Sequence, residues 1–270
     1  MKGVLAATAT VLVAVTAAVV AAQAPVVNAK VETRSVTQGL AREIQTVVDR
    51  GQTLWFGYRV PKLMPANGTV RSTEWCCGRC RLEPPTEVVV LARVEARSLV
   101  ELRAIGVDCD LDASGMPLVW FEGVNGNDSV AWLASLVTGT PANTRDRMPE
   151  RAISAIAQHA APAAADPLVR FARQAATPQL RGQALSSLAM RGAAQALPTI
   201  NAALDQDPDT QVKRRAVQSL AQMPRGEGIP RLMEIARTHA NTEIRRQAMQ
   251  ALGQSRDPRA VDFFEQILVK

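Results

Sequence analysis

Residues 148–270 repeat one hydrophobic pattern at a spacing of 32 residues, without a gap. In each of four segments, an apolar residue is followed by apolar residues four, five and eight positions later, which together form one face of an α-helix. The segments begin at Met148, Leu180, Val212 and Ile244. The pattern predicts that every segment starts with an amphipathic helix in the same register.

A second apolar stripe with helical spacing follows the first in every segment. It consists of Leu168/Phe171/Ala172, Ile200/Ala203/Leu204, Leu232/Ile235/Ala236 and Phe264/Ile267/Leu268. Polar stretches such as 205–210 separate the segments. One pair of helices cannot bury its apolar face alone, whereas stacked pairs form a continuous core. The sequence therefore predicts an α-solenoid of four two-helix units over Met148–Lys270.

The repeats resemble HEAT repeats, in particular the short bacterial kind that also occurs in phycobilin lyases. The residues that carry the resemblance are 209–221, with the sequence DTQVKRRAVQSLA, and 244–253, with the sequence IRRQAMQALG. The resemblance covers 148–270 and leaves the N-terminal part of the chain unrecognised. It implies a concave helical surface that binds a protein or peptide.

The two histidines do not form the metal site of a related repeat enzyme. Deoxyhypusine hydroxylase holds iron with recurring His-Glu pairs, but Ala160 follows His159 and Ala240 follows His239 in this chain. No chromophore pocket of the phycobilin-lyase kind is indicated either. We therefore expect no metal and no cofactor, and we assign both histidines to turns or to the surface.

The chain before the repeats has the pattern of a small α+β domain, which we place at 30–138. An apolar stripe predicts a helix over Ser35–Arg50, and Asp128 is expected to cap a second helix that runs to Val137. Short apolar or alternating runs predict strands at Thr53–Val60, Glu87–Ala96, Leu99–Val107 and Pro117–Glu122. The short link at 96–98 predicts a hairpin, and we expect a mostly antiparallel sheet. Residues 139–147 are the predicted linker.

Large aromatic residues are concentrated in this first domain. They are Trp55, Tyr58, Trp75, Trp120 and Trp132. Aromatic side chains on short strands usually form the core of a small domain, although they also line binding clefts. We expect them to be core residues.

Residues 1–29 have the pattern of a secretory signal peptide. Lys2 precedes an apolar run over Gly3–Ala22, and small residues follow. Cleavage after Ala29 is preferred to cleavage after Ala24, because Pro25 would follow the earlier cut. The alternative is an uncleaved membrane anchor, since the run is about long enough to span a bilayer. We expect a periplasmic or extracellular protein.

Charge adds one candidate binding surface. The chain carries a net charge of +6, and 47% of its residues are apolar, which excludes a disordered chain. Arg181, Lys213 and Arg245 occupy one repeat position, and Arg214 and Arg246 occupy the next. Stacking brings these residues into a basic row, which is expected either to bind an acidic partner or to pair with acids in the neighbouring turns. Nucleic acid is not expected, because aromatic residues do not interleave with the basic ones.

The cysteines are the most distinctive local feature of the sequence. Cys76, Cys77 and Cys80 lie in the segment WCCGRC, and Cys109 follows later. Structural disulfides are favoured for an exported chain, with three full pairings open. Cys77 and Cys80 also resemble a thioredoxin active site, but the helix that should follow is interrupted by prolines. A zinc site is the third interpretation, and it has only one Cys-x-x-Cys.

The sequence contains no motif for nucleophilic or acid–base catalysis. Neither a G-x-S-x-G elbow nor an H-E-x-x-H motif is present. We therefore expect a non-catalytic scaffold or adaptor that binds a protein or peptide in the cell envelope through its solenoid. The alternative is a thiol-disulfide redox protein that uses Cys77 and Cys80.

Overall fold

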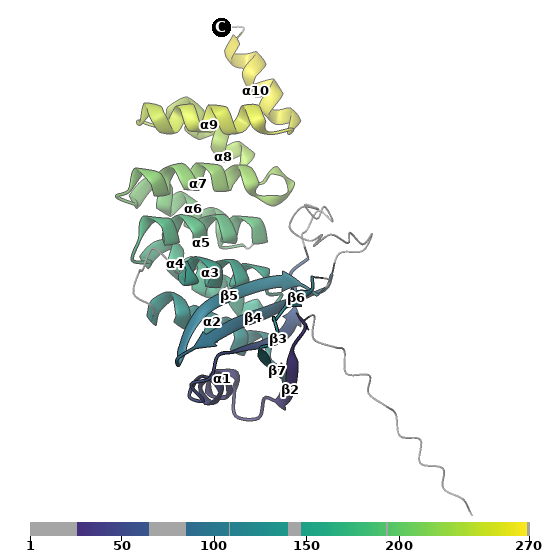
Figure 1. The fold of residues 1–270 in the computed structure, drawn as a ribbon. Helices are drawn as coiled ribbons and strands as arrows, with labels where there is room; N and C mark the ends of the chain where they lie inside the picture. Colours follow the sequence, from purple (N-terminus) through teal and green to yellow (C-terminus); the bar gives the residue numbers. More distant parts are fainter. Residues whose placement is uncertain (1–25, 65–84, 108, 140–146, 193, 269–270) are drawn as a thin grey trace, which may run out of the picture.

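The computed structural model describes residues 26–64, 85–107, 109–139, 147–192 and 194–268, and it joins a sheet to a stack of helices (Figure 1). The strands are β1 (Val26–Val27), β2 (Lys30–Ser35), β3 (Leu54–Pro61), β4 (Glu87–Glu95), β5 (Ser98–Gly106), β6 (Leu111–Asp112) and β7 (Pro117–Glu122). Helices α1 (Leu40–Val48) and α2 (Gly126–Gly139) accompany the sheet. The predicted strands and both predicted helices of this region are confirmed, with the first helix starting at Leu40 rather than at Ser35. The expected cap at Asp128 is wrong, because α2 starts at Gly126 and Asp128 lies inside its first turn.

The main sheet is mixed, so the prediction of an antiparallel sheet is wrong. Its five strands lie in the order β2-β7-β3-β4-β5, and β7 runs parallel to both β2 and β3. The antiparallel pairs are β3–β4 and β4–β5. Helix α1 connects β2 to β3, and a helical crossover joins strands that run in the same direction. The sequence shows only local hairpins, such as the tight β4–β5 turn at Ala96 and Arg97, where both residues have positive φ.

Strand β2 is absent from the sequence-based prediction because its residues carry no buried pattern. Its side chains are exposed or half-buried, and the strand is held by backbone pairing with β7 along its whole length. Arg50 adds a two-armed contact to Glu32, with nitrogen–oxygen distances of 2.7 and 2.8 Å. The strand is therefore defined by tertiary contacts rather than by hydrophobic alternation.

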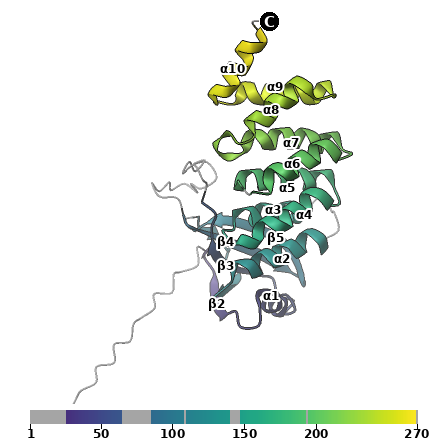
Figure 2. The ribbon, with the colours of Figure 1, turned by 180° about the vertical axis from the view of Figure 1, so that it is seen from behind.

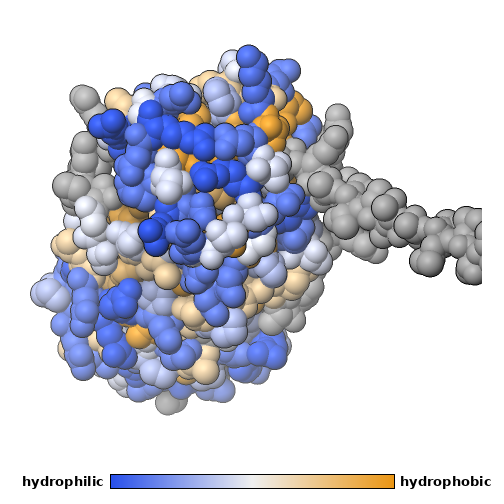
Figure 3. All heavy atoms as spheres, turned by 90° about the horizontal axis from the view of Figure 1, so that it is seen from below, coloured by the Kyte–Doolittle hydropathy of each residue, from blue (hydrophilic) through white to orange (hydrophobic). Residues whose placement is uncertain are grey.

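The aromatic residues of the described region are core residues, as predicted. Tyr58 is fully buried with Trp132 on the face of the sheet that α1 and α2 cover, and Trp55 and Trp120 are buried on the opposite face. Arg59 stacks over Trp120, and Arg93 and Arg103 stack over Trp55. Trp75 lies outside the described residues. Seen from the α1 end, the surface is mostly hydrophilic, with apolar residues in small groups (Figure 3).

Helices stack above the sheet in two layers. The first layer contains α3 (Met148–Gln158), α5 (Pro178–Arg191), α7 (Thr210–Gln222) and α9 (Thr242–Gln254). The second contains α4 (Ala165–Gln174), α6 (Ala196–Gln206) and α8 (Ile229–Thr238), and α10 (Pro258–Leu268) follows α9 (Figures 1 and 2). The α-solenoid prediction is confirmed. The three later first-layer helices start with equivalent caps, in which the side chains of Thr177, Asp209 and Asn241 accept hydrogen bonds from first-turn N–H groups.

One apolar core runs from the sheet into the helical stack. It contains buried residues from Leu40 through Ile153 to Phe263. Helix α3 packs against α2 and beside the edge strand β5, where Arg151 Nη1 donates to the Leu102 carbonyl at 3.2 Å. Helix α3 thereby covers an edge that would otherwise be open to pairing with another chain. The predicted linker falls largely at 140–146, outside the described residues.

Helix α10 does not bury the stripe that the sequence predicts. Phe263 and Ala260 are buried, whereas Phe264 is only partly buried and Ile267 and Leu268 are exposed. The equivalent residues of α4, α6 and α8 are buried or half-buried between neighbouring helices. Among the described helices, none covers the outer side of α10, which turns away from the stack (Figure 1). In α10, Phe263 therefore faces the core in place of Phe264, the residue that the repeat pattern predicts.

The segment assigned to the signal peptide ends inside the fold. Residues 1–25 lie outside the described residues, but β1 pairs with β6, and the backbone N–H of Ala113 donates to the Val27 carbonyl at 2.9 Å. Val26 and Ala29 pack against the buried cluster around Trp55. No helix in the described part of the chain is long and apolar enough to cross a membrane.

Candidate functional site

The basic row predicted from the repeats lies at the carboxyl ends of the second-layer helices. The Arg181 side chain donates to the carbonyl of Ala175, which follows α4, and Lys213 Nζ is 3.5 Å from the carbonyl of Asp205 in the last turn of α6. Arg245 Nη1 donates to the carbonyl of His239, which follows α8, at 2.7 Å. Each residue thus places positive charge at the negative end of a helix.

Three members of the row also pair with carboxylates. Arg181 forms a two-armed contact with the buried carboxylate of Asp207, at 2.7 and 3.0 Å. Arg214 and Arg246 both donate to Glu243. Burial opposes the ionisation of Asp207, but the hydrogen bonds from Arg181 and from the Asp209 backbone outweigh it and hold the pKa of Asp207 below its usual value. These contacts match the structural alternative for the row, and its role in binding stays a prediction.

The cysteine cluster contributes little to the described structure. Cys76, Cys77 and Cys80 lie outside the described residues. Cys109 is buried, with 3% of its surface exposed. The disulfide, redox and zinc interpretations therefore stay predictions.

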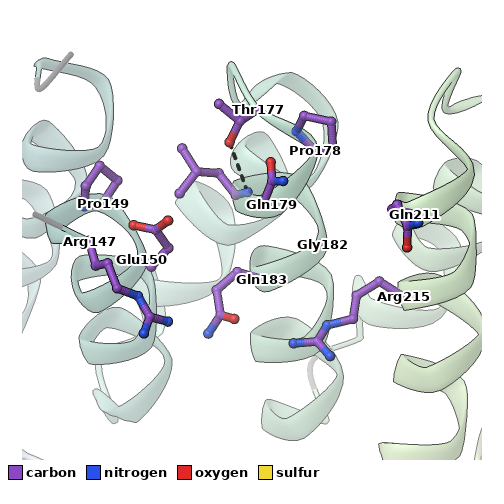
Figure 4. Close-up of a pocket in the computed structure, with 11 residues that line it drawn as sticks. Arg147, Pro149, Glu150, Thr177, Pro178, Gln179, Gly182, Gln183, Gln211 and Arg215 are labelled. Atoms are coloured by element: carbon purple, nitrogen blue, oxygen red, sulfur yellow. Dashed lines mark hydrogen bonds between the residues drawn. The ribbon is translucent and has the colours of Figure 1, made fainter. Parts of the chain in front are cut away.

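The first-layer helices form a hollow that we did not predict from the sequence, which we call the central groove (Figure 4). It has a volume of about 580 Å³ and lies over the first turns of α3 and α5 and the facing side of α7. Its polar lining comes from Arg147, Glu150, Gln179, Gln183, Gln211 and Arg215. A cavity of this size with converging polar groups is typical of a binding site.

Gly182 sits in the floor of the central groove. The equivalent repeat positions on the other first-layer helices are Glu150, Arg214 and Arg246, so this helix alone has no side chain there. A Cβ atom at Gly182 would lie 3.1 Å from Cγ and 3.3 Å from Cβ of Arg215. The glycine therefore lets the Arg215 stem lie against α5. A glycine inside a helix is unfavourable by about 1 kcal/mol relative to alanine.

Two further hollows continue the same face. One, of about 490 Å³, lies between strand β5 and helix α3 and includes Arg147, Ser154 and Gln158. The other, of about 350 Å³, lies between α7 and α9 and is lined mainly by glutamines, among them Gln218 and Gln250. The first layer therefore presents a polar, amide-rich face from the edge of the sheet to α9.

The charges in the central groove are not neutralised within the described residues. Neither Arg147 nor Arg215 forms an ion pair there, although Arg215 Nη1 is 3.3 Å from Oε1 of Gln218. Figure 4 shows both guanidinium groups directed to the side of the groove where Gln183 lies. Arg147 also adopts a left-handed backbone conformation, with φ 43°, at the start of α3. This conformation is uncommon for residues other than glycine and clusters at functional sites.

A buried hydrogen-bond chain links the sheet to α2 and α3, and it corrects the assignment of His159 to a turn or the surface. Tyr58, Ser129 and His159 are all fully buried. The Tyr58 hydroxyl lies 2.8 Å from Ser129 Oγ, which lies 2.8 Å from His159 Nε2. Because His159 Nδ1 is 2.8 Å from the Ala155 carbonyl, which can only accept, Nδ1 carries the proton and Nε2 accepts from Ser129.

The geometry of Ser129 and His159 is that of a nucleophile and a base, but the pair is closed to substrate. Burial lowers the pKa of His159 to about 4; the Ala155 hydrogen bond opposes the shift and the charge of Arg191 adds to it. Burial likewise raises the pKa of Tyr58. Arg191 Nη1 also donates to the carbonyl of His159 at 2.7 Å. This buried series of hydrogen bonds therefore holds the sheet and the helical stack together. His239, in contrast, is partly exposed and lies after α8, as expected.

Within the described residues, no group of three or more histidine, cysteine or acidic side chains is placed to hold a metal ion.

A signal for the central groove was present in the sequence, because the repeat column 150, 182, 214 and 246 reads Glu, Gly, Arg, Arg. Gly182 stands out in that column. The unpaired state of Arg147 and Arg215 has no sequence signal, since it depends on which acids the stacking brings near.

Comparison with known proteins supports the assignment of the helical stack. A search of curated proteins finds no match to the chain. A family model of HEAT repeats matches residues 197–270, which span α6 to α10 apart from their first residue. The C-terminal segment of this chain is therefore a HEAT-repeat structure.

Proposed function

We propose that this protein is a non-catalytic adaptor that binds a protein or peptide along the first-layer face of its helical stack. HEAT repeats are generally surfaces for protein interaction, and stacked repeats present extended concave faces. The single observation that carries the proposal is the central groove, where polar side chains from α3, α5 and α7 converge without satisfying one another. The stack in this proposal consists of four two-helix units, α3–α4 to α9–α10.

The proposal places the protein in the cell envelope after export, as the N-terminal sequence pattern indicates. The contacts of β1 favour the earlier of the two cleavage sites, after Ala24. Cleavage after Ala29 would remove β1, which pairs with β6, and would expose the cluster around Trp55. Intact-mass measurement of the mature protein tests this point, and a mature N-terminus at Lys30 would contradict it.

Site-specific photocrosslinking tests the binding proposal. A photoreactive residue replaces Gln183 in the central groove of the full chain, and a matched variant carries it at Arg173, an exposed residue of α4 in the second layer. Both variants are expressed in the native host, irradiated and analysed by mass spectrometry. We expect a reproducible protein adduct from position 183 and none from position 173. Equal adducts from both positions, or none from position 183, would refute the proposal.

A further inference from the structure

We propose that the central groove binds an extended acidic segment of its partner, with Arg147 and Arg215 contacting carboxylates and the groove glutamines contacting the peptide backbone. This inference rests on the proposed function and specifies the chemistry of the partner. Two features of the groove support it: the arginines that lack carboxylate partners and the spacing of the amides.

The two arginines of the groove have no carboxylate partner within the described residues, in contrast to several other arginines of the helical stack. Arg181, Arg214, Arg231, Arg246 and Arg259 each form an ion pair with a carboxylate. Arg147 and Arg215 form none within the described residues, and their guanidinium groups face one shared hollow (Figure 4). A guanidinium group has planar N–H donors that can form a bidentate pair of hydrogen bonds with a carboxylate. The hollow is therefore complementary to negative charge.

The glutamines are spaced to follow an extended backbone. Gln179 and Gln183 come from α5, and Gln211 comes from α7, the next helix of the layer. Neighbouring helices lie about 8–10 Å apart, and an extended chain advances about 3.3 Å per residue. One helix interval therefore corresponds to about three residues of bound peptide. An amide both donates and accepts, so it can bind a backbone C=O and N–H.

The contacts already made inside the groove leave these groups available. Gln183 Nε2 donates to Ser154 Oγ at 3.0 Å, which orients the amide and leaves its oxygen as an acceptor. The side chains of Gln179 and Gln211 make no hydrogen bond within the described residues. Gly182 positions one of these groups, because the absence of a side chain lets the Arg215 stem pack against α5 at the groove.

Glu150 is the one carboxylate in the lining of the groove, and it sets a limit on affinity. It forms no ion pair within the described residues, so its charge acts against an acidic ligand. Glu150→Gln keeps the shape of the side chain and removes that charge. The proposal therefore predicts that Glu150→Gln binds an acidic peptide more tightly. A general loss of structure would weaken binding instead.

Selection from a random twelve-residue peptide library displayed on phage tests the inference with the full-length protein. We expect the wild-type protein to select peptides enriched in Asp and Glu, and the Arg147→Gln/Arg215→Gln double variant to lose this enrichment. The matched control is Arg170→Gln/Arg173→Gln, which removes the same two charges from exposed positions of α4, outside the groove, and should select like the wild type. Circular dichroism melts confirm that each variant is folded.

Affinities of one selected acidic peptide then give the magnitudes, measured by fluorescence anisotropy. We expect Arg215→Gln to weaken binding about tenfold and Glu150→Gln to strengthen it about threefold. A tenfold change in affinity corresponds to about 1.4 kcal/mol. Peptides that bind in the groove without acidic enrichment would overturn this inference and leave the proposed function standing. No selection at all, or selected peptides indifferent to every groove substitution, would overturn both.

Discussion

Acid should destabilise this protein through His159, and the burial of the imidazole gives the sign of the effect. His159 is neutral in the folded state, because Nε2 accepts from Ser129 and Nδ1 donates to Ala155. Protonation would place a second N–H against a hydroxyl group that already donates to that nitrogen. The pKa of His159 is about 4 in the folded protein, compared with 6.5 for the unperturbed side chain.

A histidine whose pKa is lower in the folded state binds its proton preferentially in the unfolded state. Its stabilising contribution is fully present above pH 6.5 and is lost as the pH falls toward 4. The shift of about 2.5 pH units corresponds to about 3 kcal/mol, at 1.36 kcal/mol per unit. Between pH 7 and pH 5 the loss should be about 2 kcal/mol, before most carboxylates are protonated.

Urea unfolding at pH 7 and pH 5, followed by tryptophan fluorescence, measures this loss. His159→Gln removes the titrating group, so its free energy of unfolding should be lower at pH 7 and should change by less than about 0.5 kcal/mol between the two pH values. His239→Gln removes the other histidine, which lies outside the buried chain, and should retain the acid-dependent loss of the wild type. If wild type and His159→Gln lose the same free energy, the reasoning is wrong.

Three further predictions concern the stability of individual contacts. Tyr58→Phe removes the hydroxyl that donates to Ser129 and should lower the free energy of unfolding by about 1 kcal/mol in urea titrations at pH 7. Arg181→Gln leaves the buried Asp207 without its two-armed partner and should cost about 2 kcal/mol, with unchanged affinity for a groove peptide; a loss of affinity would show that the basic row binds. Phe263→Ala should cost about 3–5 kcal/mol, whereas Leu268→Ala on the same helix should cost less than about 0.5 kcal/mol in thermal or urea unfolding.

The helical stack was the most predictable part of the molecule, because its contacts are local and repeated. The apolar positions starting at Val212 specify the buried face of α7 directly, and the caps at Thr177, Asp209 and Asn241 lie 32 residues apart. Each unit meets a copy of its own environment, so one correct register determines the whole stack. The exception is α10, where the missing outer neighbour lets Phe263 replace Phe264 in the core.

The sheet and the central groove depend on contacts between distant segments, which the sequence does not display. Strand β2 is polar and is defined by its pairing with β7, about 90 residues later in the chain. His159 is buried because the end of α3 packs against α2 and pairs with Lys62 after β3, which local pattern does not reveal. The groove likewise depends on which charges stacking leaves unpaired, so Arg147 and Arg215 could not be singled out from composition.

The two ends of the helical stack differ in how they are closed. Strand β5 and helix α2 cover α3, and the hydrogen-bond chain through His159 fixes that contact. At the other end, α10 leaves Val261 and Leu268 exposed to solvent. Repeat stacks are stabilised by nearest neighbours, so a unit with one neighbour opens more easily than a unit with two. Amide hydrogen exchange should therefore proceed as a gradient, fastest in α10 and slowest in α3, which gives the solenoid a defined direction of fraying.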